Sequence, residues 1–308
     1  MAANLTITIF CRWNKTDLSE ALDRMAKIRI VTDATASLDP EFIAQHQITV
    51  LPVEIGFGDE RFVINSGDDG KRLFERMAEG IAKPCHATIP AQTLQQTFEQ
   101  LNKKSEDTLI ILSSAKLSQG YTQARAAARS FLGRCRIEIV DSMSASWGLG
   151  LVVKQAVKAA EAGLTLEEAV RRIRGLLPHI YVVFFVDRLD YLERGNRIGV
   201  AQALLGTMLR IKPLLLIEEG EIVPLEKMRT VRLAVEKLGS FVAEFAEIEE
   251  LAILQSPLAE EKNPLIKGLQ EQLRTTFPGR RFPVMPYDPI LACHLGPEAL
   301  GLMVYEKD

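Results

Sequence analysis

Residues 108–132 read TLIILSSAKLSQGYTQARAAARSFL, and this stretch decides the fold. Its first part, TLIILSS (108–114), is short, rich in branched apolar residues and polar only at its end, which predicts a buried strand. The last part of the stretch, YTQARAAARSFL (121–132), has the amphipathic spacing of a helix that covers a sheet. A buried strand followed by such a helix is the repeating unit of a parallel α/β sheet.

The same pattern recurs on both sides of this stretch. We predict strands at KIRIVTD, ITVLPV and RIEIVDS (27–33, 48–53 and 136–142). Helices are predicted at AQTLQQTFEQLNKK, WGLGLVVKQAVKAAEAG and TLEEAVRRIRGLL (91–104, 147–163 and 165–177). The third helix opens with Thr165 and has Glu168 three residues later, the pattern of a capping box. The first half of the chain is therefore predicted to be a βαβ arrangement.

The second half predicts another α/β unit. Strands are expected at IYVVFFVD, PLLLIEEGEIVPLEKMRT, LAILQS and LGLMVYE (180–187, 213–230, 251–256 and 300–306). The segment LIEEGEIVPL has Glu-Gly at its centre and predicts a hairpin. A chain of 308 residues exceeds the size at which one core usually stops growing. We therefore predict an N-terminal extension, helical or disordered, over 1–24 and two α/β domains over 25–175 and 176–308.

Composition excludes several classes of function. The net charge of −3 gives no basic surface for nucleic acid, and no polybasic run suggests a membrane surface. No apolar stretch approaches the roughly 18 residues that a membrane span needs. The first residues lack the cationic start and cleavage site of a secretory signal, so we expect a cytoplasmic protein.

Four widely spaced cysteines, Cys11, Cys85, Cys135 and Cys293, form no CxxC motif. In a chain of this size they predict reduced thiols rather than a disulfide framework. Two of them directly precede histidines, in Cys85-His86 and Cys293-His294, and a zinc site built from both pairs is chemically possible. Adjacent residues rarely point to one metal, so we expect no metal and no other cofactor.

Polar residues gather where the predicted strands end. The strand bodies are apolar, but the ends carry Thr32-Asp33, Ser113-Ser114, Asp141-Ser142 and Asp187. Ligands of open parallel sheets bind at the carboxyl ends of strands, where such side chains and the following helix N-termini converge. The same residues also cap helices very often, so the pattern alone supports only a crevice.

The familiar catalytic signatures are absent. The sequence has no GxGxxG after a strand, no GxxxxGK[ST], no HExxH and no GxSxG. His294 follows an apolar run and precedes Gly296-Pro297, a setting in which most histidines are simply core or turn residues. A serine nucleophile, Ser118 or Ser114, working with His294 remains an alternative, although no nucleophile elbow supports it.

A series of motifs resembles the DegV family, whose characterised members are fatty-acid-binding subunits of bacterial fatty acid kinase. The motifs run in order from about Lys27 to Tyr305, and LERGNRIG and RIKPLL are the most specific of them. The full series is VTDATASL, HATIPA, LSSAKLSQGYTQA, VDSMSASWGLG, LDYLERGNRIG, RIKPLL, KMRT and ACHLGPEALGL. The resemblance implies two α/β domains with mainly parallel sheets and a ligand cavity near the domain interface.

The resemblance also implies roles for individual residues. Ser118 and His294 match the serine and histidine that bind the fatty acid carboxylate, and Arg197 and Arg229 match arginines associated with the kinase partner or the phosphoryl group. The sequence departs from the family pattern at Ala34, Ala87 and Gln119. Thr88, beside Ala87, still offers a hydroxyl. The expected ligand-binding set is Ser118, His294, Thr88, Thr32, Asp33 and Ser114.

The function implied is that of a carrier rather than an enzyme. The protein is expected to bind a long-chain fatty acid and to present its carboxylate to the catalytic subunit of a fatty acid kinase, which forms an acyl phosphate. One alternative is a Ser/His-dependent hydrolase or transferase acting on a small acyl substrate. Another is a lipid-sensing or storage module without a kinase.

Overall fold

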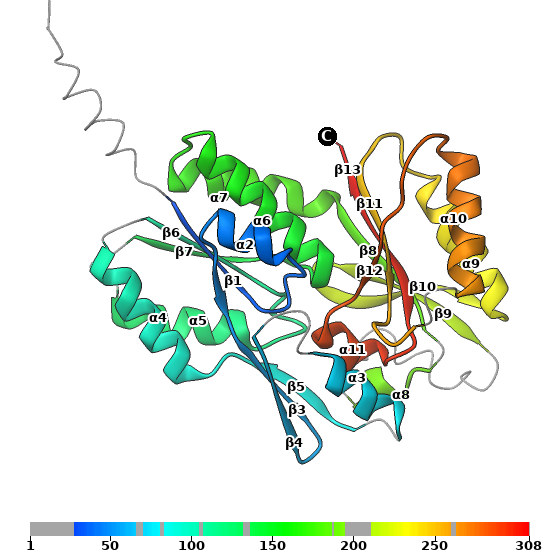
Figure 1. Ribbon diagram of the computed structural model, residues 1–308, viewed down its shortest axis with the longest axis horizontal. Coiled ribbons are helices and arrows are strands. Elements are labelled where there is room, and N and C mark those ends of the chain that lie inside the picture. The colour runs from blue at the N-terminus through cyan, green and yellow to red at the C-terminus, as the bar shows by residue number, and fades with distance from the viewer. Residues whose placement is uncertain are drawn as a thin grey trace, which may run out of the picture.

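The computed structural model describes residues 28–65, 70–80, 83–104, 107–131, 136–186, 188–194, 211–259 and 263–307. These residues form an α/β fold with three sheets, two of which are large and lie side by side (Figure 1). The predicted extension over 1–24 lies outside the described residues.

Sheet A is the parallel sheet that the opening stretch predicts. Its strands are β2 (Thr49–Leu51), β1 (Arg29–Asp33), β6 (Thr108–Leu112) and β7 (Ile137–Asp141), in that order, and every pair is parallel. All five residues of β6 are buried, as a central strand covered on both faces requires.

Helices cover both faces of sheet A. On one face lie α4 (Ala91–Lys104) and α5 (Gly120–Ala128), and on the other lie α6 (Ser146–Glu161) and α7 (Leu166–Leu176), with α2 (Pro40–Gln45) on the same side (Figure 1). The capping box is present: Thr165 accepts from the Glu168 backbone N–H, and the Glu168 carboxylate accepts from the Thr165 N–H. The predicted βαβ arrangement is therefore confirmed.

Pro52 divides the strand that the sequence predicts over 48–53. β2 ends at Leu51, and β3 (Val53–Phe57) begins sheet B with β4 (Glu60–Ile64) and β5 (Cys85–Thr88). Sheet B is antiparallel, in the order β4-β3-β5. The prediction of one continuous strand is wrong because proline has no N–H for the ladder and the chain leaves sheet A there.

Sheet C forms the second half of the molecule. It contains β8 (Ile180–Phe185), β9 (Lys212–Glu218), β10 (Glu221–Met228), β11 (Ile248–Gln255), β12 (Val284–Pro286) and β13 (Leu300–Glu306), in the order β10-β9-β8-β13-β11-β12. Its pairs are antiparallel except for β11 with β12. The expectation of mainly parallel sheets therefore holds for sheet A and fails for sheets B and C.

The predicted hairpin explains why two of the strands of sheet C, β9 and β10, are antiparallel. β9 and β10 pair across Glu219-Gly220, and both turn residues have positive φ (48° and 78°). A two-residue turn with positive φ at both positions matches the twist of antiparallel strands. The hairpin is confirmed, and a tight turn of this kind requires antiparallel pairing.

Each face of sheet C packs against a different layer. Val182 and Phe184 belong to the core that sheet C shares with sheet A, whereas Val183 and Phe185 pack with α9 (Val231–Val242) and α10 (Pro264–Thr276). Sheet C is therefore a middle layer, and the two halves of the chain share one hydrophobic core. The domain boundary at 175/176 remains a prediction.

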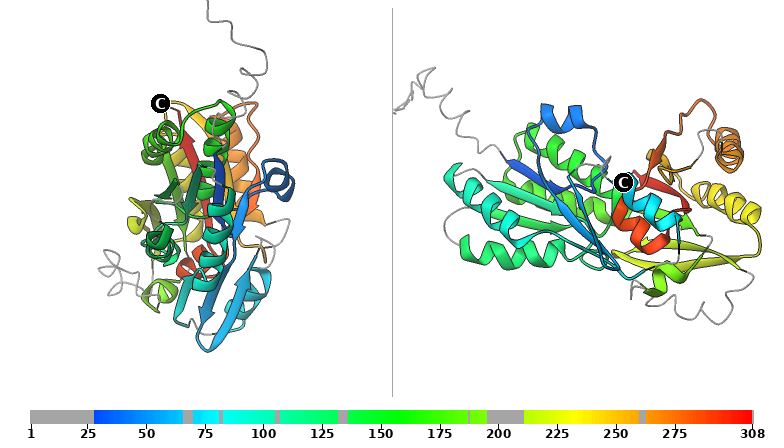
Figure 2. Two further views of the ribbon diagram at one scale, coloured as in Figure 1. Left: turned by 90° about the vertical axis from the view of Figure 1, so that its left-hand side faces the viewer. Right: turned by 60° about the horizontal axis from the view of Figure 1, so that its bottom comes forward.

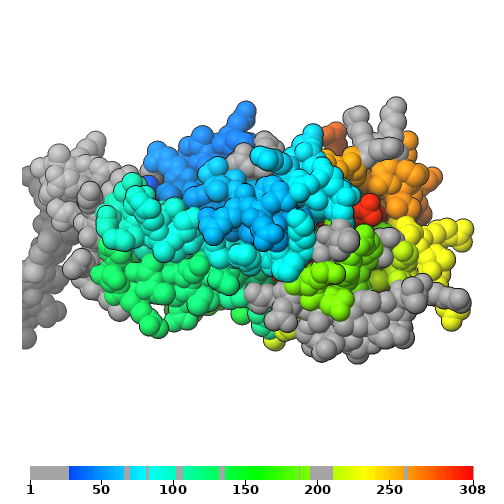
Figure 3. Space-filling view, turned by 90° about the horizontal axis from the view of Figure 1, so that it is seen from below, coloured from blue at the N-terminus to red at the C-terminus, as the bar shows by residue number. Residues whose placement is uncertain are grey.

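Three short elements lie where the halves meet. They are α3 (Lys71–Ala78), α8 (Asp190–Arg194) and α11 (Pro289–Leu295), and α11 contacts α3, α8 and β5 (Figure 2). All seven residues of α11 are buried. Seen from below, the blue-to-green segments of the first half cover the left and centre, and the yellow and orange segments of the second half lie to the right (Figure 3).

Candidate functional site

Asp33 links two loops at the carboxyl edge of sheet A. Its carboxylate accepts hydrogen bonds from the Ser113 backbone N–H (2.9 Å) and hydroxyl (2.8 Å), the Thr35 N–H (3.0 Å) and the Thr35 hydroxyl. The residue is only 1% exposed. Four donors give Asp33 a structural role, and its predicted role in ligand binding stays a prediction.

Ser114 connects this edge to the hairpin of sheet C. Its hydroxyl donates to the Gly220 carbonyl oxygen (2.6 Å) and accepts from the Lys116 N–H (3.1 Å). Gly220 has a φ of 78°, and a Cβ at this position would lie 2.4 Å from the Ser114 Oγ. Glycine is therefore required there both by the turn and by the close approach. Ser114 fastens sheet A to sheet C, and whether it also binds a ligand is untested.

The two predicted threonines have little internal hydrogen bonding. Thr32 is fully buried, and its hydroxyl has no hydrogen-bond partner among the described residues. With Asp33, Ser37 and Leu38 it lines a hollow of about 340 Å³. The half-buried Thr88 ends β5, where its hydroxyl is 3.5 Å from the Glu54 carbonyl oxygen, too long for a strong bond.

Ser118 lies between β6 and α5 and is 2% exposed. Its backbone N–H donates to the Ser114 carbonyl oxygen (2.9 Å), and its hydroxyl oxygen accepts from the Gly120 N–H (3.1 Å) where α5 begins. Because the hydroxyl oxygen accepts that bond, the hydroxyl hydrogen is the part of Ser118 that a ligand oxygen would meet.

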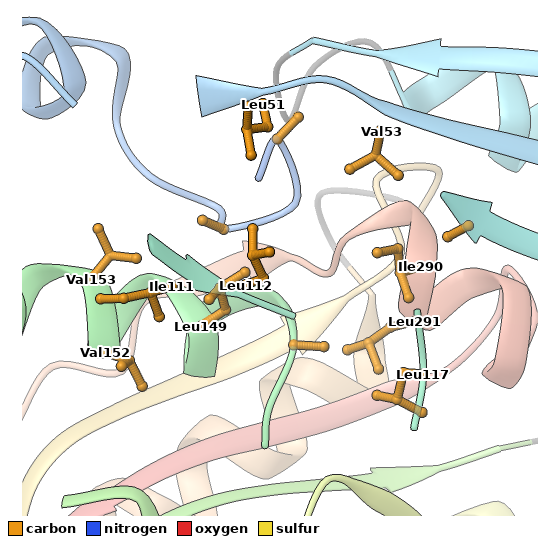
Figure 4. Packing of buried hydrophobic residues seen from close by; sticks show 14 of the residues in the cluster. Leu51, Val53, Ile111, Leu112, Leu117, Leu149, Val152, Val153, Ile290 and Leu291 are labelled. Atoms are coloured by element: carbon orange, nitrogen blue, oxygen red, sulfur yellow. The ribbon is translucent and has the colours of Figure 1, made fainter. Parts of the chain in front are cut away.

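His294 lies in the last turn of α11 and reaches the Ser118 segment. Its Nε2 is 3.1 Å from the Leu117 carbonyl oxygen, and the ring is 3% exposed. The carbonyl of Leu117 and the N–H of Ser118 belong to the same peptide unit. The structure therefore brings together the two residues predicted to bind a head group, although 176 positions (294 minus 118) separate them. In the close-up, Leu117 lies next to Leu291 of α11 (Figure 4).

The residues flanking α11 hold it in place. Asp288 caps the helix, because its carboxylate accepts from the Ile290 N–H (2.6 Å) and the Leu291 N–H (3.2 Å). The Asp288 N–H donates to the Ser146 hydroxyl (3.1 Å) at the start of α6. Beyond the helix, the Tyr287 hydroxyl donates to the Gly296 carbonyl oxygen (2.8 Å). The position of His294 is thus fixed at both ends of its helix.

Sequence reasoning missed this anchoring set of Tyr287, Asp288 and Ser146. A signal for part of it was present, because Asp288 followed by Pro289 is a common start of a helix. Ser146 has a φ of 54°, an uncommon conformation for a residue with a side chain, and no local sequence pattern indicates it.

Burial changes the acidity of two carboxyl groups near the site. It raises the pKa of Asp288 to about 7, although the N–H groups of Ile290 and Leu291 oppose the increase, and the charge of Asp33 adds to it. Burial also raises the pKa of Asp141 above its usual value, against hydrogen bonds from the Met143 and Ala115 N–H groups. Both groups therefore bind protons more tightly than exposed aspartates.

The cysteines correct a prediction. Cys85 of β5 and Cys293 of α11 form a disulfide, with their Cα atoms 5.6 Å apart. The expectation of reduced thiols is wrong for this pair, because the fold brings together two cysteines that the sequence places 208 positions apart. No group of three or more His, Cys, Asp or Glu side chains suited to a metal occurs in the described part of the chain. The two Cys-His pairs do meet, but through their sulfur atoms.

A groove of about 840 Å³ lies beside the Ser118 segment. Lys116 and Tyr121, which flank that segment, line it together with Asp141 from sheet A and Leu216 and Ile217 from sheet C. Its walls thus come from both halves of the chain. Its size is within the range of small-molecule sites.

The remaining predicted residues are less informative. Arg229 is exposed in the turn between β10 and α9. Arg197 and Asp187 lie outside the described residues.

Comparison with known proteins assigns the fold to a family. The model of the DegV family, described as "Uncharacterised protein, DegV family", matches residues 27–307. The chain belongs to the DegV family. The resemblance inferred from LERGNRIG, RIKPLL and the other motifs is therefore confirmed.

Relatives and solved structures of DegV proteins cover almost the whole chain. A DegV domain-containing protein of Streptomyces coelicolor is 33% identical over 286 residues, which is 91% of this chain and 99% of that protein. A structure titled as fatty acid binding of a DegV family protein from Thermus thermophilus is 27% identical, with a TM-score of 0.78 and coverage of 91% and 100%. DegV of Bacillus subtilis, titled a fatty acid binding protein, is 25% identical, with a TM-score of 0.75 and coverage of 92% and 100%.

Across the described part of this DegV protein, every helix is too short or too polar to cross a bilayer.

Proposed function

We propose that this DegV-family protein binds a long-chain fatty acid, with its carboxylate at Ser118 and His294. One observation carries the proposal: the imidazole of His294 lies at the Leu117–Ser118 peptide, so the two expected head-group residues converge from opposite halves of the chain. The Thermus thermophilus and Bacillus subtilis relatives, whose titles state fatty acid binding, support the same ligand class.

The chemistry of the site suits a carboxylate. Ser118 and His294 are both nearly inaccessible to solvent, and a carboxylate removed from water needs hydrogen-bond donors in its place. The Ser118 hydroxyl can supply one, the His294 ring can supply another when its Nε2–H turns from the Leu117 carbonyl oxygen to the carboxylate, and the hydroxyl of Thr88 is a third candidate. The head group would set orientation, because about sixteen methylenes contribute on the order of 12 kcal/mol of gross transfer free energy before association costs.

We further propose that the protein is a carrier in the cytoplasm that presents the carboxylate to the catalytic subunit of a fatty acid kinase. The absence of a phosphate-binding loop from the sequence favours a separate kinase. Arg197 and Arg229 are the proposed contacts for that partner or for the phosphoryl group, since arginine suits phosphate recognition.

Mass spectrometry of organic extracts tests the ligand class directly. Protein purified under native conditions from a bacterial host should carry a long-chain fatty acid in near-stoichiometric amount. Repeated extracts without such a lipid, together with no uptake of added palmitate or oleate, would contradict the proposal.

Substitutions test the head-group site. Ser118→Ala and His294→Gln should each weaken fatty acid binding by about 1–3 kcal/mol, the cost of depriving a buried acceptor of one donor. The double variant should cost less than the sum, because both donors serve one carboxylate. Ser240→Ala is a matched control, since the Ser240 hydroxyl donates only to its own helix at Glu236. Unchanged binding in both single variants would place the head group elsewhere.

The carrier and hydrolase alternatives predict different activities. A hydrogen bond from the His294 ring to the Leu117 carbonyl oxygen requires a protonated Nε2, so this nitrogen does not act as a general base for a serine while it makes that bond. We expect no turnover of acyl esters by the purified protein. With a fatty acid kinase subunit and ATP, we expect acyl phosphate, and Arg229→Ala or Arg197→Ala should lower its formation while leaving lipid binding intact. Lipid binding without phosphorylation would favour the storage alternative.

A further inference from the structure

We propose that Cys85 and Cys293 form a reversible, redox-controlled crosslink that holds β5 against α11 and slows ligand exchange at the His294 site. The part that concerns ligand exchange rests on the proposed function. The crosslink itself does not.

The separation of the Cys85 and Cys293 backbones permits a disulfide. The Cα atoms are 5.6 Å apart, inside the range that disulfides require, and the two residues come from different parts of the fold. Cys85 opens β5 of sheet B, and Cys293 lies within α11, which follows β12 of sheet C. The bond therefore joins the two halves of the chain covalently at the point where β5 meets α11.

Each cysteine is close in sequence to an expected head-group residue. Cys293 directly precedes His294 in α11, and Thr88 ends the strand that Cys85 begins. β5 pairs with β3 from Cys85, opposite Phe57, to Thr88, opposite Glu54. A displacement of β5 relative to α11 would thus change the distance between the Thr88 hydroxyl and the His294 ring.

Burial explains why the crosslink would control exchange. Ser118 is 2% exposed and His294 is 3% exposed, so a ligand cannot reach or leave them without movement of surrounding elements. The hydrogen bonds of Tyr287 and Asp288, which include one to Ser146 of α6, hold α11 in place and do not depend on the disulfide. Reduction would therefore leave α11 folded while removing its covalent bond to β5.

The redox step is balanced with a peroxide as oxidant. The thiolate of Cys85, which is 8% exposed against 2% for Cys293, attacks the peroxide and becomes a sulfenic acid with release of water or alcohol. The Cys293 thiolate then attacks that sulfur, the S–S bond forms and a water leaves. The two sulfur atoms together lose two electrons, which reduce the peroxide. A dithiol reverses the bond by exchange and becomes a cyclic disulfide. In a reducing compartment, disulfides are usually transient or redox-sensing, and the second of these roles is the one proposed for this pair.

The experiment compares full-length protein treated with hydrogen peroxide and with dithiothreitol. Peptide mapping after alkylation should find the Cys85–Cys293 linked peptide only in the oxidised sample. Hydrogen exchange of β5 and α11 should then be at least about tenfold faster in the reduced protein, because the crosslink no longer restrains local opening. Release of a bound fluorescent long-chain fatty acid should be faster by about the same factor.

Controls separate the crosslink from its effect on the ligand. Cys85→Ser and Cys293→Ser should each exchange at the reduced rate in both solutions, which excludes effects through Cys11 or Cys135. If either serine variant fails to fold, the reduced wild-type protein provides the same comparison. Failure of the linked peptide to form, or equal hydrogen exchange in the two states, would overturn the proposal. If no fatty acid binds at all, the proposed function fails, and hydrogen exchange alone still decides whether the crosslink restrains β5 and α11.

Discussion

The carboxyl edge of sheet A and the segment that joins β12 to β13 of sheet C contribute to one site in different ways. At the edge of sheet A, polar residues lie at the ends of strands or in the loops that follow, as Asp33 ends β1 and Ser118 lies in the loop after β6. In sheet C, the strand ends contribute little, and a buried seven-residue helix, α11, brings His294. A parallel sheet places its strand ends together by topology, whereas an antiparallel sheet needs an inserted element to reach the same place.

Two buried aspartates illustrate the difference. Asp33 accepts four hydrogen bonds on its two carboxylate oxygens, so this carboxylate is satisfied by neighbouring protein groups. Asp288 uses only Oδ1 to cap α11, and its Oδ2 has no partner among the described residues. The first carboxylate has hydrogen-bond donors on both oxygens, and the second favours its protonated form because burial raises its pKa to about 7.

The largest effect on the free energy of unfolding is expected from a substitution in the core that supports α11. Phe184 of β8 is 1% exposed, and its ring centroid lies 6.2 Å from that of Tyr287. Phe184→Ala should lower the free energy of unfolding by about 3–5 kcal/mol, because it leaves a cavity in the face shared with sheet A. Phe184→Leu, measured by the same urea titration, should cost much less. A small effect of the alanine variant would mean that the two halves do not share a core.

The second-largest effect of a substitution on the free energy of unfolding is expected at the carboxyl edge of sheet A. Asp33→Ala should lower the free energy of unfolding by about 2–3 kcal/mol, since buried N–H groups of Ser113 and Thr35 lose their acceptor. Urea denaturation measures it, with Asp59→Ala in the β3–β4 turn as an exposed control. A cost no larger than that of the control would remove the structural role assigned to Asp33.

The pH dependence of stability tests α11. The pKa of Asp288 is about 7 in the folded protein against 3.8 for an exposed aspartate, so folding favours its protonated form. Its contribution to stability is fully present below about pH 4 and is lost as pH rises through 7, a fall on the order of 4 kcal/mol.

Asp288→Asn isolates this contribution, because an asparagine carbonyl can still cap the helix. Relative to wild type, the variant should lose less stability between pH 4 and pH 7 in parallel urea titrations. Identical pH profiles would show that Asp288 is ionised in the folded protein like an exposed group.

The smallest effect concerns Thr32. Thr32→Val removes a buried hydroxyl that has no internal partner, so stability should stay within about 0.5 kcal/mol of wild type or rise slightly. If Thr32 belongs to the ligand site, the same variant should weaken fatty acid binding by a measurable factor. A loss of stability by thermal denaturation would show instead that the hydroxyl stabilises the fold.

Local sequence patterns predicted the strands of sheet A, the helices α4, α5, α6 and α7 that cover it, the capping box at Thr165 and the β9–β10 hairpin, but not α2. Each of these depends on neighbours within a few residues, through side-chain periodicity, a cap or a turn. The DegV motifs were also local, and they pointed to Ser118 and His294 before their positions in space were known.

Only the tertiary structure decided the rest. It split 48–53 at Pro52, paired the strands of sheet C mainly antiparallel, joined Cys85 to Cys293 and brought His294 to the Ser118 segment. These features join residues far apart in the chain. Their arrangement is fixed by which apolar faces can be buried against each other. Residues 182–185 of β8, for example, are all apolar and point alternately to the two layers that sandwich sheet C. The sequence of the strand does not specify which layer each face meets.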